Sequence, residues 1–317
     1  MGFAAGSGAS VLTDAESRHL IIQLLTAPTA RDTQQRIGAS NLCNGCDYCL
    51  AANLMGDMRD SALLDRVWGG RVVGTAIHGL LEERLKWALQ GQDNHDTWAA
   101  GTLADVGRRF PDALSEFRMK IGTLGSYGEV WSTADLVLPG QRQAFDHKGT
   151  TIQKLCILID FIEMKAGRSA PYGRAHPKVK LSEAKYAEEM AKMEYKVTSY
   201  YGQCCLYGLG ANRMGIPVER VTINFIARDH AMYFDNPTLD RYSDPKATKG
   251  VWSLGFDYSE EYAMALWNRA FFIWEKLEAG SVPADFDHHP MCWPCSMDSG
   301  LSEKPVPDVE ATFGSTA

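Results

Sequence analysis

The sequence predicts a mixed α/β protein with one central sheet flanked by helices. Segments that alternate apolar and polar residues with the period of a β-strand are interspersed with longer segments whose apolar residues recur at helical spacing. The chain has 317 residues, of which 45% are hydrophobic and 22% charged, which is typical of a folded protein with an ordinary core. Because no internal repeat or low-complexity linker divides the chain, we expect one domain with elaborations.

The N-terminal region contains one predicted helix. The residues from Thr13 to Glu16 form a capping box, and the apolar stripe of the helix follows between Leu20 and Leu25. Toward the C-terminus the chain is rich in proline and irregular. We therefore expect an N-terminal helical segment over residues 1–39, the main domain over 40–296 and a loose tail over 297–317.

The middle of the chain contains a helix and a predicted hairpin. Residues 72–90 keep apolar side chains at helical spacing, and residues 91–120 are polar and mixed, which indicates a loop and a short helix. Residues 129–138 alternate like a strand and end at a Pro-Gly turn, after which residues 143–151 form a second short strand. We expect these two strands to pair as an antiparallel hairpin.

Three further elements are predicted before the proline-rich region. Residues 181–209 form a long helix, and residues 218–228 alternate as a strand does. Residues 259–279 form the last helix, with Ser259 as its N-cap and Gly280 just past its end.

The charge balance excludes a protein whose whole surface attracts nucleic acid. Lys and Arg number 32 and Asp and Glu number 39, which gives a net charge of −7 and a pI of about 5.6. A local basic groove remains compatible with this balance. No apolar run approaches the roughly 20 residues of a membrane span, and the N-terminus lacks the features of a signal peptide. We therefore expect a cytoplasmic protein without membrane contact.

Five of the eight cysteines lie in two groups with C-x-x-C spacing, Cys43/Cys46/Cys49 and Cys292/Cys295. In a reducing compartment such pairs are more often ligands of a metal ion or iron–sulfur cluster than disulfides. Because no other cysteine lies downstream, Cys292 and Cys295 are both taken as ligands, and Cys43 with Cys46 gives a matching upstream pair. The predicted ligands are therefore Cys43, Cys46, Cys292 and Cys295, and Cys49 is expected to pack as a small buried hydrophobe. Four thiolates suit both Zn²⁺ and a 4Fe–4S cluster.

Polar residues also occur inside the predicted hairpin. Asp135 lies in an otherwise apolar strand, where a carboxylate is costly unless it is paired or bound to a cation. On the next strand, alternation places Asp146 and Lys148 on one face, with His147 pointing away. A carboxylate that holds a divalent metal and an ammonium that stabilises developing charge are the groups that phosphodiester hydrolysis requires. An ordinary ion pair on a strand face explains the same spacing.

Two helical pairs accompany these strand residues. Gly74 and His78 lie early in the helix over 72–90, and Gln203 and Tyr207 lie one turn apart on the long helix. The second spacing places both polar tips on one helix face. Each pair by itself is also explained as an ordinary helix surface.

Taken in order, the G-x-x-x-H helix, the strand aspartate, the D-x-K strand and the Q-x-x-x-Y helix resemble the RecB-like branch of the PD-(D/E)XK nuclease superfamily. The flanking cysteines are similar to those of its iron–sulfur members, which include AddB nuclease domains, CRISPR-adaptation exonucleases and phage relatives. The resemblance covers roughly residues 40 to 296. It implies a restriction-endonuclease-like fold, a mixed central sheet flanked by helices, whose chain ends are tied together by a 4Fe–4S cluster. The usual family arrangement has one upstream and three downstream cysteines, unlike this chain.

The resemblance also implies roles for individual residues. Mg²⁺ or Mn²⁺ would be held by His78, Asp135, Asp146 and the backbone carbonyl of His147, with Mn²⁺ favoured by the histidine. Lys148 would activate water and stabilise the transition state. The remaining catalytic residues are expected to be Gln203 and Tyr207, which would orient the catalytic strand or touch DNA.

A basic segment over residues 165–180 supports nucleic acid as the substrate. It contains five Lys or Arg residues and no acidic residue. A run of this kind suits phosphate contacts, with an aromatic side chain available for base stacking, although a solvated flexible loop has the same composition. The predicted DNA-binding residues are Arg168, Tyr172, Arg174, Lys178 and Lys180.

These observations lead to one main hypothesis and two alternatives. The main hypothesis is a metal-dependent DNA exonuclease with a structural 4Fe–4S cluster, acting on single-stranded or end-frayed DNA in recombination, repair or phage DNA processing. A helicase, recombinase or integrase would be its partner. The first alternative is a non-catalytic DNA-binding or assembly subunit that keeps the fold and the cluster. The second is a zinc-stabilised protein, which explains the cysteines but leaves the ordered polar residues to chance.

Overall fold

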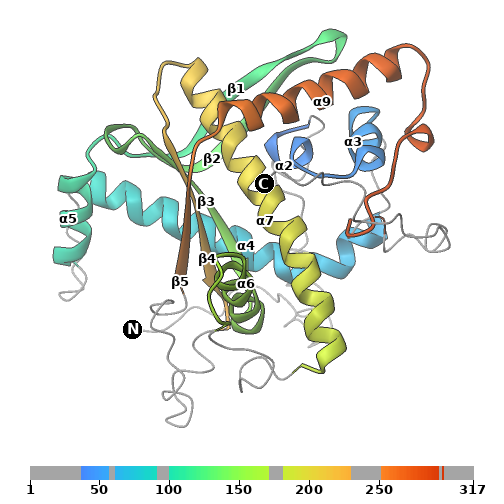
Figure 1. Ribbon diagram of the computed structural model, residues 1–317. Coiled ribbons are helices and arrows are strands. Elements are labelled where there is room, and N and C mark those ends of the chain that lie inside the picture. Colours follow the sequence, from blue (N-terminus) through green and yellow to red (C-terminus); the bar gives the residue numbers. More distant parts are fainter. Residues whose placement is uncertain are drawn as a thin grey trace, which may run out of the picture.

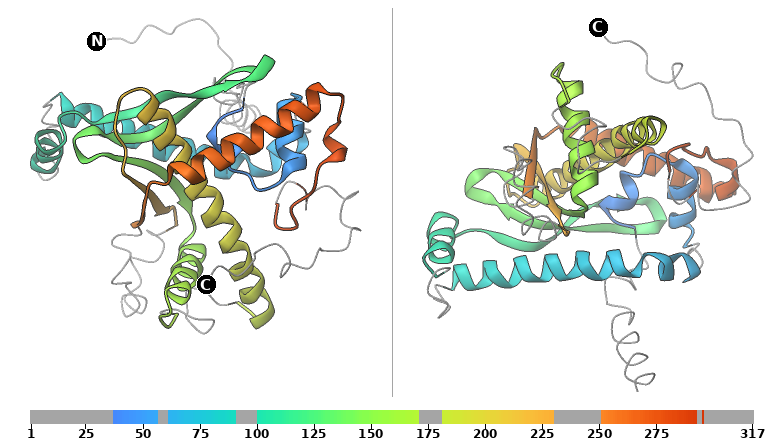
Figure 2. Two further views of the ribbon diagram at one scale, coloured as in Figure 1. Left: turned by 45° about the horizontal axis from the view of Figure 1, so that its top comes forward. Right: turned by 90° about the horizontal axis from the view of Figure 1, so that it is seen from below.

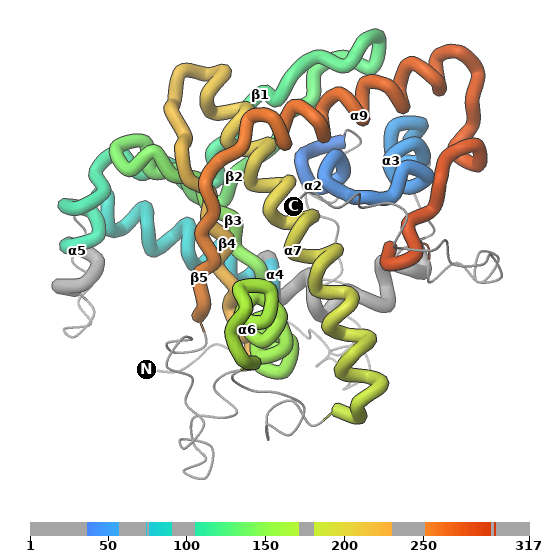
Figure 3. The backbone as a smooth tube through the Cα atoms, viewed as in Figure 1, coloured from blue at the N-terminus to red at the C-terminus, as the bar shows by residue number. Residues whose placement is uncertain are grey.

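The computed structural model of the protein describes residues 37–56, 61–90, 100–170, 181–229 and 251–292, together with Cys295. The predicted N-terminal helix and the predicted tail over residues 297–317 lie outside these residues. Figure 3 traces the described backbone from one end to the other.

The described strands form one five-stranded mixed sheet in the order β1-β2-β3-β4-β5 (Figure 1). The strands are β1 (Leu114–Leu124), β2 (Gly128–Leu138), β3 (Gln143–Thr150), β4 (Arg220–Ala227) and β5 (Val251–Asp257). Strands β3 and β4 are parallel, and the other neighbouring pairs are antiparallel. The mixed α/β class and the hairpin of β2 and β3 are therefore confirmed. A parallel pair requires a crossover, and two helices between β3 and β4 provide it.

Helices cover both faces of the sheet, as the right-hand view in Figure 2 shows. Helix α4 runs along one side, whereas α7 lies on the other side and packs against β1 through β4. The longer helices are α3 (Asp47–Leu54), α4 (Ser61–Leu89), α5 (Ala100–Arg109), α6 (Ile152–Lys165), α7 (Glu183–Arg213) and α9 (Glu260–Glu278), and α2 (Ala39–Leu42) is one turn. Among the described helices, none has the length and apolar character that crossing a bilayer requires.

Three of the long helices begin at a hydroxyl side chain. Thr151 accepts a hydrogen bond from the third residue of α6, Ser182 does the same for α7, and Ser259 accepts one from Tyr262 at the start of α9. Each cap satisfies a backbone N–H that has no partner inside its helix. Gly280, with a φ of +100°, follows the end of α9. The predicted boundaries of this last helix are confirmed.

The sequence patterns did not reveal α6, β1 or β5. Helix α6 is apolar on most of its circumference, so its residues show no amphipathic period. Strand β1 interleaves charged residues with buried Met119 and Ile121, and it lies in the segment where only a loop and a short helix were expected. Helix α5 accounts for that short helix.

The core lies between the sheet and α7, where glycines allow close approach. A Cβ atom at Gly208 would lie 2.5 Å from a ring carbon of Tyr258, which is inside the contact distance of carbon atoms. We therefore expect Gly208→Ala to lower the free energy of unfolding by about 1–3 kcal/mol, although alanine is the better helix former.

Gly79→Ala is the matched control for this prediction, because Gly79 is also helical and a Cβ atom there would meet nothing within 4 Å. This control should be neutral or stabilise the protein by up to about 1 kcal/mol. Urea unfolding of both variants measures the difference. Equal effects at the two positions would show that the Tyr258 contact is not tight in solution.

Candidate functional site

The centre of the candidate site is the point where β2 and β3 stop pairing. Pairing ends with Leu136 opposite Phe145, so the same register continued by one residue places Asp135 beside Asp146. Here the Oδ2 atom of Asp135 accepts a hydrogen bond from the backbone N–H of His147 at 2.5 Å. The carboxylate thereby satisfies a backbone donor that has no strand partner on this side. Both aspartates are buried.

A third carboxylate occupies the matching position on β1. The residues on either side of Glu116 pair with those on either side of Asp135, so the two acidic residues face each other across the strands. Glu116 has a φ of +46°, which residues other than glycine rarely adopt. The strands β1, β2 and β3 thus each contribute one acidic residue at the same level of the sheet. No sequence pattern singled out Glu116.

Helix α4 places a histidine, His78, beside two of these carboxylates. The Nδ1 atom of His78 lies 3.0 Å from Oδ1 of Asp135 and 3.8 Å from Oε1 of Glu116. The three side chains offer ligand atoms that all lie within 4.8 Å of one another. They line a cavity of about 250 Å³, together with Glu82 and His147 among others. One imidazole and two carboxylates are a donor set that can hold a divalent metal ion.

On the other side of β3, four polar residues form a closed ring of interactions with α7. The Nζ atom of Lys148 lies 2.8 Å from Oδ2 of Asp146 and donates a hydrogen bond to Oε1 of Gln203 at 3.0 Å. The side-chain amide of Gln203 donates to the hydroxyl of Tyr207, which in turn donates to Oδ1 of Asp146 at 3.3 Å. The structure therefore brings together the D-x-K strand and the Q-x-x-x-Y helix.

Burial and neighbouring charges shift the pKa values of Asp146, Lys148 and Asp135 in opposite directions. Burial raises the pKa of Asp146, and the neighbouring Lys148 only partly offsets this. For Lys148 burial would lower the pKa, but Asp146, Tyr200 and Asp135 together outweigh burial and the pKa is raised. Burial would likewise raise the pKa of Asp135, yet contact with His78 brings it below its usual value. Lys148 is therefore held as a cation, and Asp135 as an anion, inside a largely buried site.

The structure divides the predicted metal ligands between two adjoining groups. His78 and Asp135 lie together with Glu116, whereas Asp146 is held by Lys148 and is not among the three clustered donors. The side chain of His147 lies on the side of His78, with their ring centroids 6.1 Å apart. The prediction that His147 points away from its two neighbours is thus correct.

The predicted DNA-binding residues are only partly described. Arg168 follows α6, and its guanidinium forms an ion pair with Glu163, which raises the pKa of Arg168. Its charge is therefore already matched by a carboxylate. The other four, Tyr172, Arg174, Lys178 and Lys180, lie outside the described residues.

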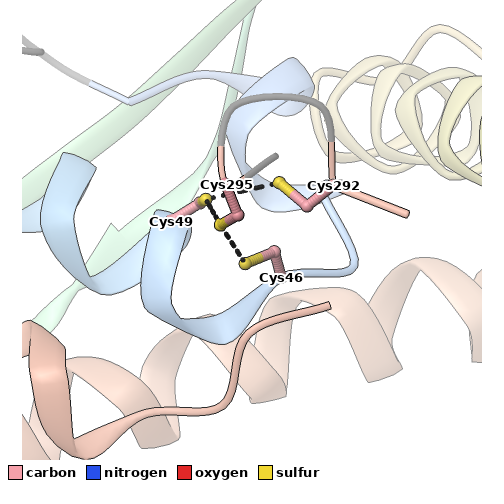
Figure 4. Close-up of side chains that lie close together, drawn as sticks. All are labelled: Cys46, Cys49, Cys292 and Cys295. Carbon is pink, nitrogen blue, oxygen red and sulfur yellow. Dashed lines mark hydrogen bonds between the residues drawn. The ribbon is translucent and has the colours of Figure 1, made fainter. Parts of the chain in front are cut away.

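The second feature is a group of four buried cysteines, Cys46, Cys49, Cys292 and Cys295 (Figure 4). Their sulfur atoms all lie within 4.8 Å of one another. The closest pairs are Cys49 with Cys295 at 3.2 Å, Cys49 with Cys292 at 3.4 Å and Cys46 with Cys295 at 3.5 Å. The group joins segments near the two ends of the described chain, as the cysteine spacing predicted.

The structure places Cys49, and not the predicted Cys43, in the cysteine group. Cys46 is the N-cap of α3, so Cys49 stands in the first turn of that helix and its thiol returns toward Cys46. Cys43 is the C-cap of α2, belongs to the main core and contacts the hydroxyl of Ser199 at 3.4 Å. Burial raises the pKa of Cys43 to about 11.

Two histidines, His288 and His289, contact sulfur atoms of the cysteine group. The backbone N–H of His289 donates to the sulfur of Cys46 at 3.5 Å, and Nδ1 of His288 lies 3.3 Å from the sulfur of Cys295. Contacts of this kind orient thiolate ligands in metal sites. Around a single tetrahedral ion with metal–sulfur bonds of about 2.3 Å, the sulfur atoms would lie about 3.8 Å apart. The observed distances are close to that spacing, so the four cysteines are compatible with a metal centre.

Comparison of the chain with models of known protein families found no match. Comparison with curated proteins likewise found none that is similar. The geometry of the two groups and the sequence resemblance are therefore what supports a function.

Proposed function

We propose that the protein is a metal-dependent DNA exonuclease with a restriction-endonuclease-like fold. The observation that carries this proposal is the ring of Asp146, Lys148, Gln203 and Tyr207, next to Asp135, where two strands separate. A buried ion pair is seldom more stabilising than apolar residues of similar volume. A half-buried ammonium beside two buried carboxylates therefore suits chemistry better than it suits stability.

Each group in the site has a role in this proposal. His78, Glu116 and Asp135 would hold Mg²⁺ or Mn²⁺, and Asp146 offers a further carboxylate on the adjoining strand. When bound, the metal ion supplies polarisation of the phosphodiester and activation of water. Lys148 orients the attacking water and stabilises the negative charge that develops on the phosphate.

Gln203 and Tyr207 act on the reacting groups through their neighbours. Gln203 accepts a hydrogen bond from the ammonium of Lys148, and Tyr207 donates one to Asp146. Both contacts come from α7, a long helix that packs across the sheet. The ammonium and the carboxylate are therefore already positioned, so little reorganisation is needed during the reaction.

We further propose that the cysteine group binds a 4Fe–4S cluster, as the sequence resemblance implies. The cluster would hold the two chain ends together and would not take part in hydrolysis. The spacing between the sulfur atoms favours a second candidate, a single Zn²⁺ ion, because four sulfurs around one ion lie closer together than four sulfurs bound to separate irons of a cluster.

The rival function is a non-catalytic DNA-binding subunit of the same fold. Such a subunit needs a phosphate-binding surface, but it has no use for a buried carboxylate and ammonium beside a histidine and a second carboxylate. Digestion of end-labelled linear DNA and of circular DNA, with Mn²⁺, with Mg²⁺ and with EDTA, tests the two functions. The proposal expects shortening of linear DNA with either metal and none with EDTA. Binding to DNA without any cleavage would favour the rival.

The role of Glu116 leads to a separate prediction. Because its carboxylate lies 3.8 Å from His78 and opposite Asp135, Glu116→Gln should weaken the apparent affinity for Mn²⁺ by roughly ten- to a hundredfold. The metal concentration that gives half-maximal cleavage measures this change, and isothermal titration of Mn²⁺ measures it without substrate.

Glu82→Gln is the matched control, because Glu82 lines the same cavity but is already paired with Lys86. This variant should require the same Mn²⁺ concentration as the unmodified protein. An equal weakening in both variants would show that general negative charge, and not ligation by Glu116, sets the metal affinity.

A further inference from the structure

A basic groove opens beside Lys148, at the carboxyl ends of the parallel strands β3 and β4. Its walls come from α6, from α7 and from the segment that carries Cys292, and it encloses about 990 Å³. Figure 1 shows the strand ends directed toward α6, with the first half of α7 beside them. Five cations line the groove, namely Lys148, Lys154, Lys192, Lys196 and Arg228. The crevice outside the carboxyl ends of parallel strands is a common place for ligand binding.

Three of these cations lack a carboxylate partner among the residues that the structure describes: Lys154, Lys196 and Arg228. The two acidic residues in the wall, Glu188 and Glu189, already contact Lys185 and Lys192.

The Lys196 side chain in this groove is half-buried, and burial lowers its pKa. The nearby charges of Lys154 and Lys192 add to this effect, and the charge of Glu189 opposes it. The groove carries five cations against two glutamates, and an anionic ligand stabilises such an excess of positive charge.

We propose that this groove binds the phosphate backbone of a single nucleic-acid strand and leads that strand to Lys148. The proposal rests on the nuclease function proposed above and specifies which form of DNA reaches the site. Asp146 and Lys148 are recessed, with side chains only 2% and 23% exposed. Double-stranded DNA is stiff, with a persistence length of about 50 nm, so a duplex would have to be deformed or melted to bring a phosphate to these recessed groups. A single strand can reach them, because its backbone is flexible.

The test is binding of a fluorescein-labelled single-stranded oligonucleotide, measured by anisotropy in EDTA so that no cleavage occurs. The variant Lys154→Gln/Lys196→Gln/Arg228→Gln should raise the Kd at least tenfold. It should also reduce the slope of log Kd against log salt by about 0.7 for each phosphate that the variant no longer binds. The control Lys120→Gln/Arg142→Gln/Lys276→Gln removes the same charge from β1, the β2–β3 turn and α9, and it should leave both values unchanged.

The outcomes separate this inference from the proposed function. Unchanged binding by the groove variant, in a protein that cleaves DNA with Mn²⁺, would overturn the groove assignment alone. Tighter binding of a duplex than of a single strand, abolished in the same variant, would overturn the single-strand assignment. Loss of single-strand binding in a protein that never cleaves would support the groove while contradicting the nuclease.

Discussion

Lys148→Gln and Asp146→Asn should each lower the rate of metal-dependent DNA cleavage by roughly a thousandfold or more. Lys148 is the cation nearest to the buried carboxylate of Asp146, at 2.8 Å, and stabilisation of developing charge by such a group is worth several kcal/mol. Single-turnover digestion of end-labelled DNA with saturating Mn²⁺ measures the chemical step directly. Saturating metal separates this loss from the weaker metal binding expected for Glu116→Gln.

These two substitutions are chosen to preserve the fold. Glutamine at position 148 keeps a donor for Asp146 and Gln203, whereas an alanine there would leave the buried carboxylate of Asp146 without a counter-ion, which costs about 3–5 kcal/mol. Lys120→Gln is the control, because Lys120 also lies on the sheet and pairs with a glutamate, Glu129. It should cleave DNA at the rate of the unmodified protein. Cleavage by Lys148→Gln at that same rate, with an unchanged melting temperature, would refute the assignment of the active site.

The hairpin and the two polar pairs could be predicted from sequence because strand alternation and helical spacing depend only on residues close together in the chain. Strand alternation alone places Asp146 and Lys148 together, and helical spacing alone places Gln203 and Tyr207 on one face of α7. The structure adds the distance between the two pairs, which depends on how α7 packs across the sheet. This packing involves residues about 60 positions apart, from Asp146 to Tyr207, and no short window of sequence contains it.

Glu116 could not be found in this way, because its place depends on strand register. It lies on β1, whose charged residues concealed the strand, and it meets Asp135 only through the pairing of β1 with β2. The difference at Cys43 has a similar origin. The three upstream cysteines are equally spaced, so the choice among them depends on where a helix begins. Helix α3 begins at Asp47, one residue after Cys46, and this brings Cys49 into the group.

The exchange of Cys43 for Cys49 leads to the prediction with the clearest readout. Cys49→Ala should release the bound metal and lower the melting temperature by roughly 10 °C, because loss of one of four ligands removes several kcal/mol of binding energy. The effect should extend beyond the site, since the group connects α3 with the segment of Cys292. Visible absorption, iron and sulfide content, zinc content and thermal unfolding of protein purified without oxygen measure these changes.

Cys43→Ala is the matched control, because Cys43 lies three residues before Cys46 and is also buried but contacts Ser199 instead of the other thiols. It should keep its full metal content and lose only about 1 kcal/mol of stability, as expected for a small truncation in the core. Loss of metal from Cys43→Ala but not from Cys49→Ala would make Cys43 the fourth ligand. The metal itself decides between the two candidate centres. Four iron and four sulfide per chain support the cluster, whereas one zinc in a colourless protein supports the single ion suggested by sulfur distances of 3.2–3.5 Å.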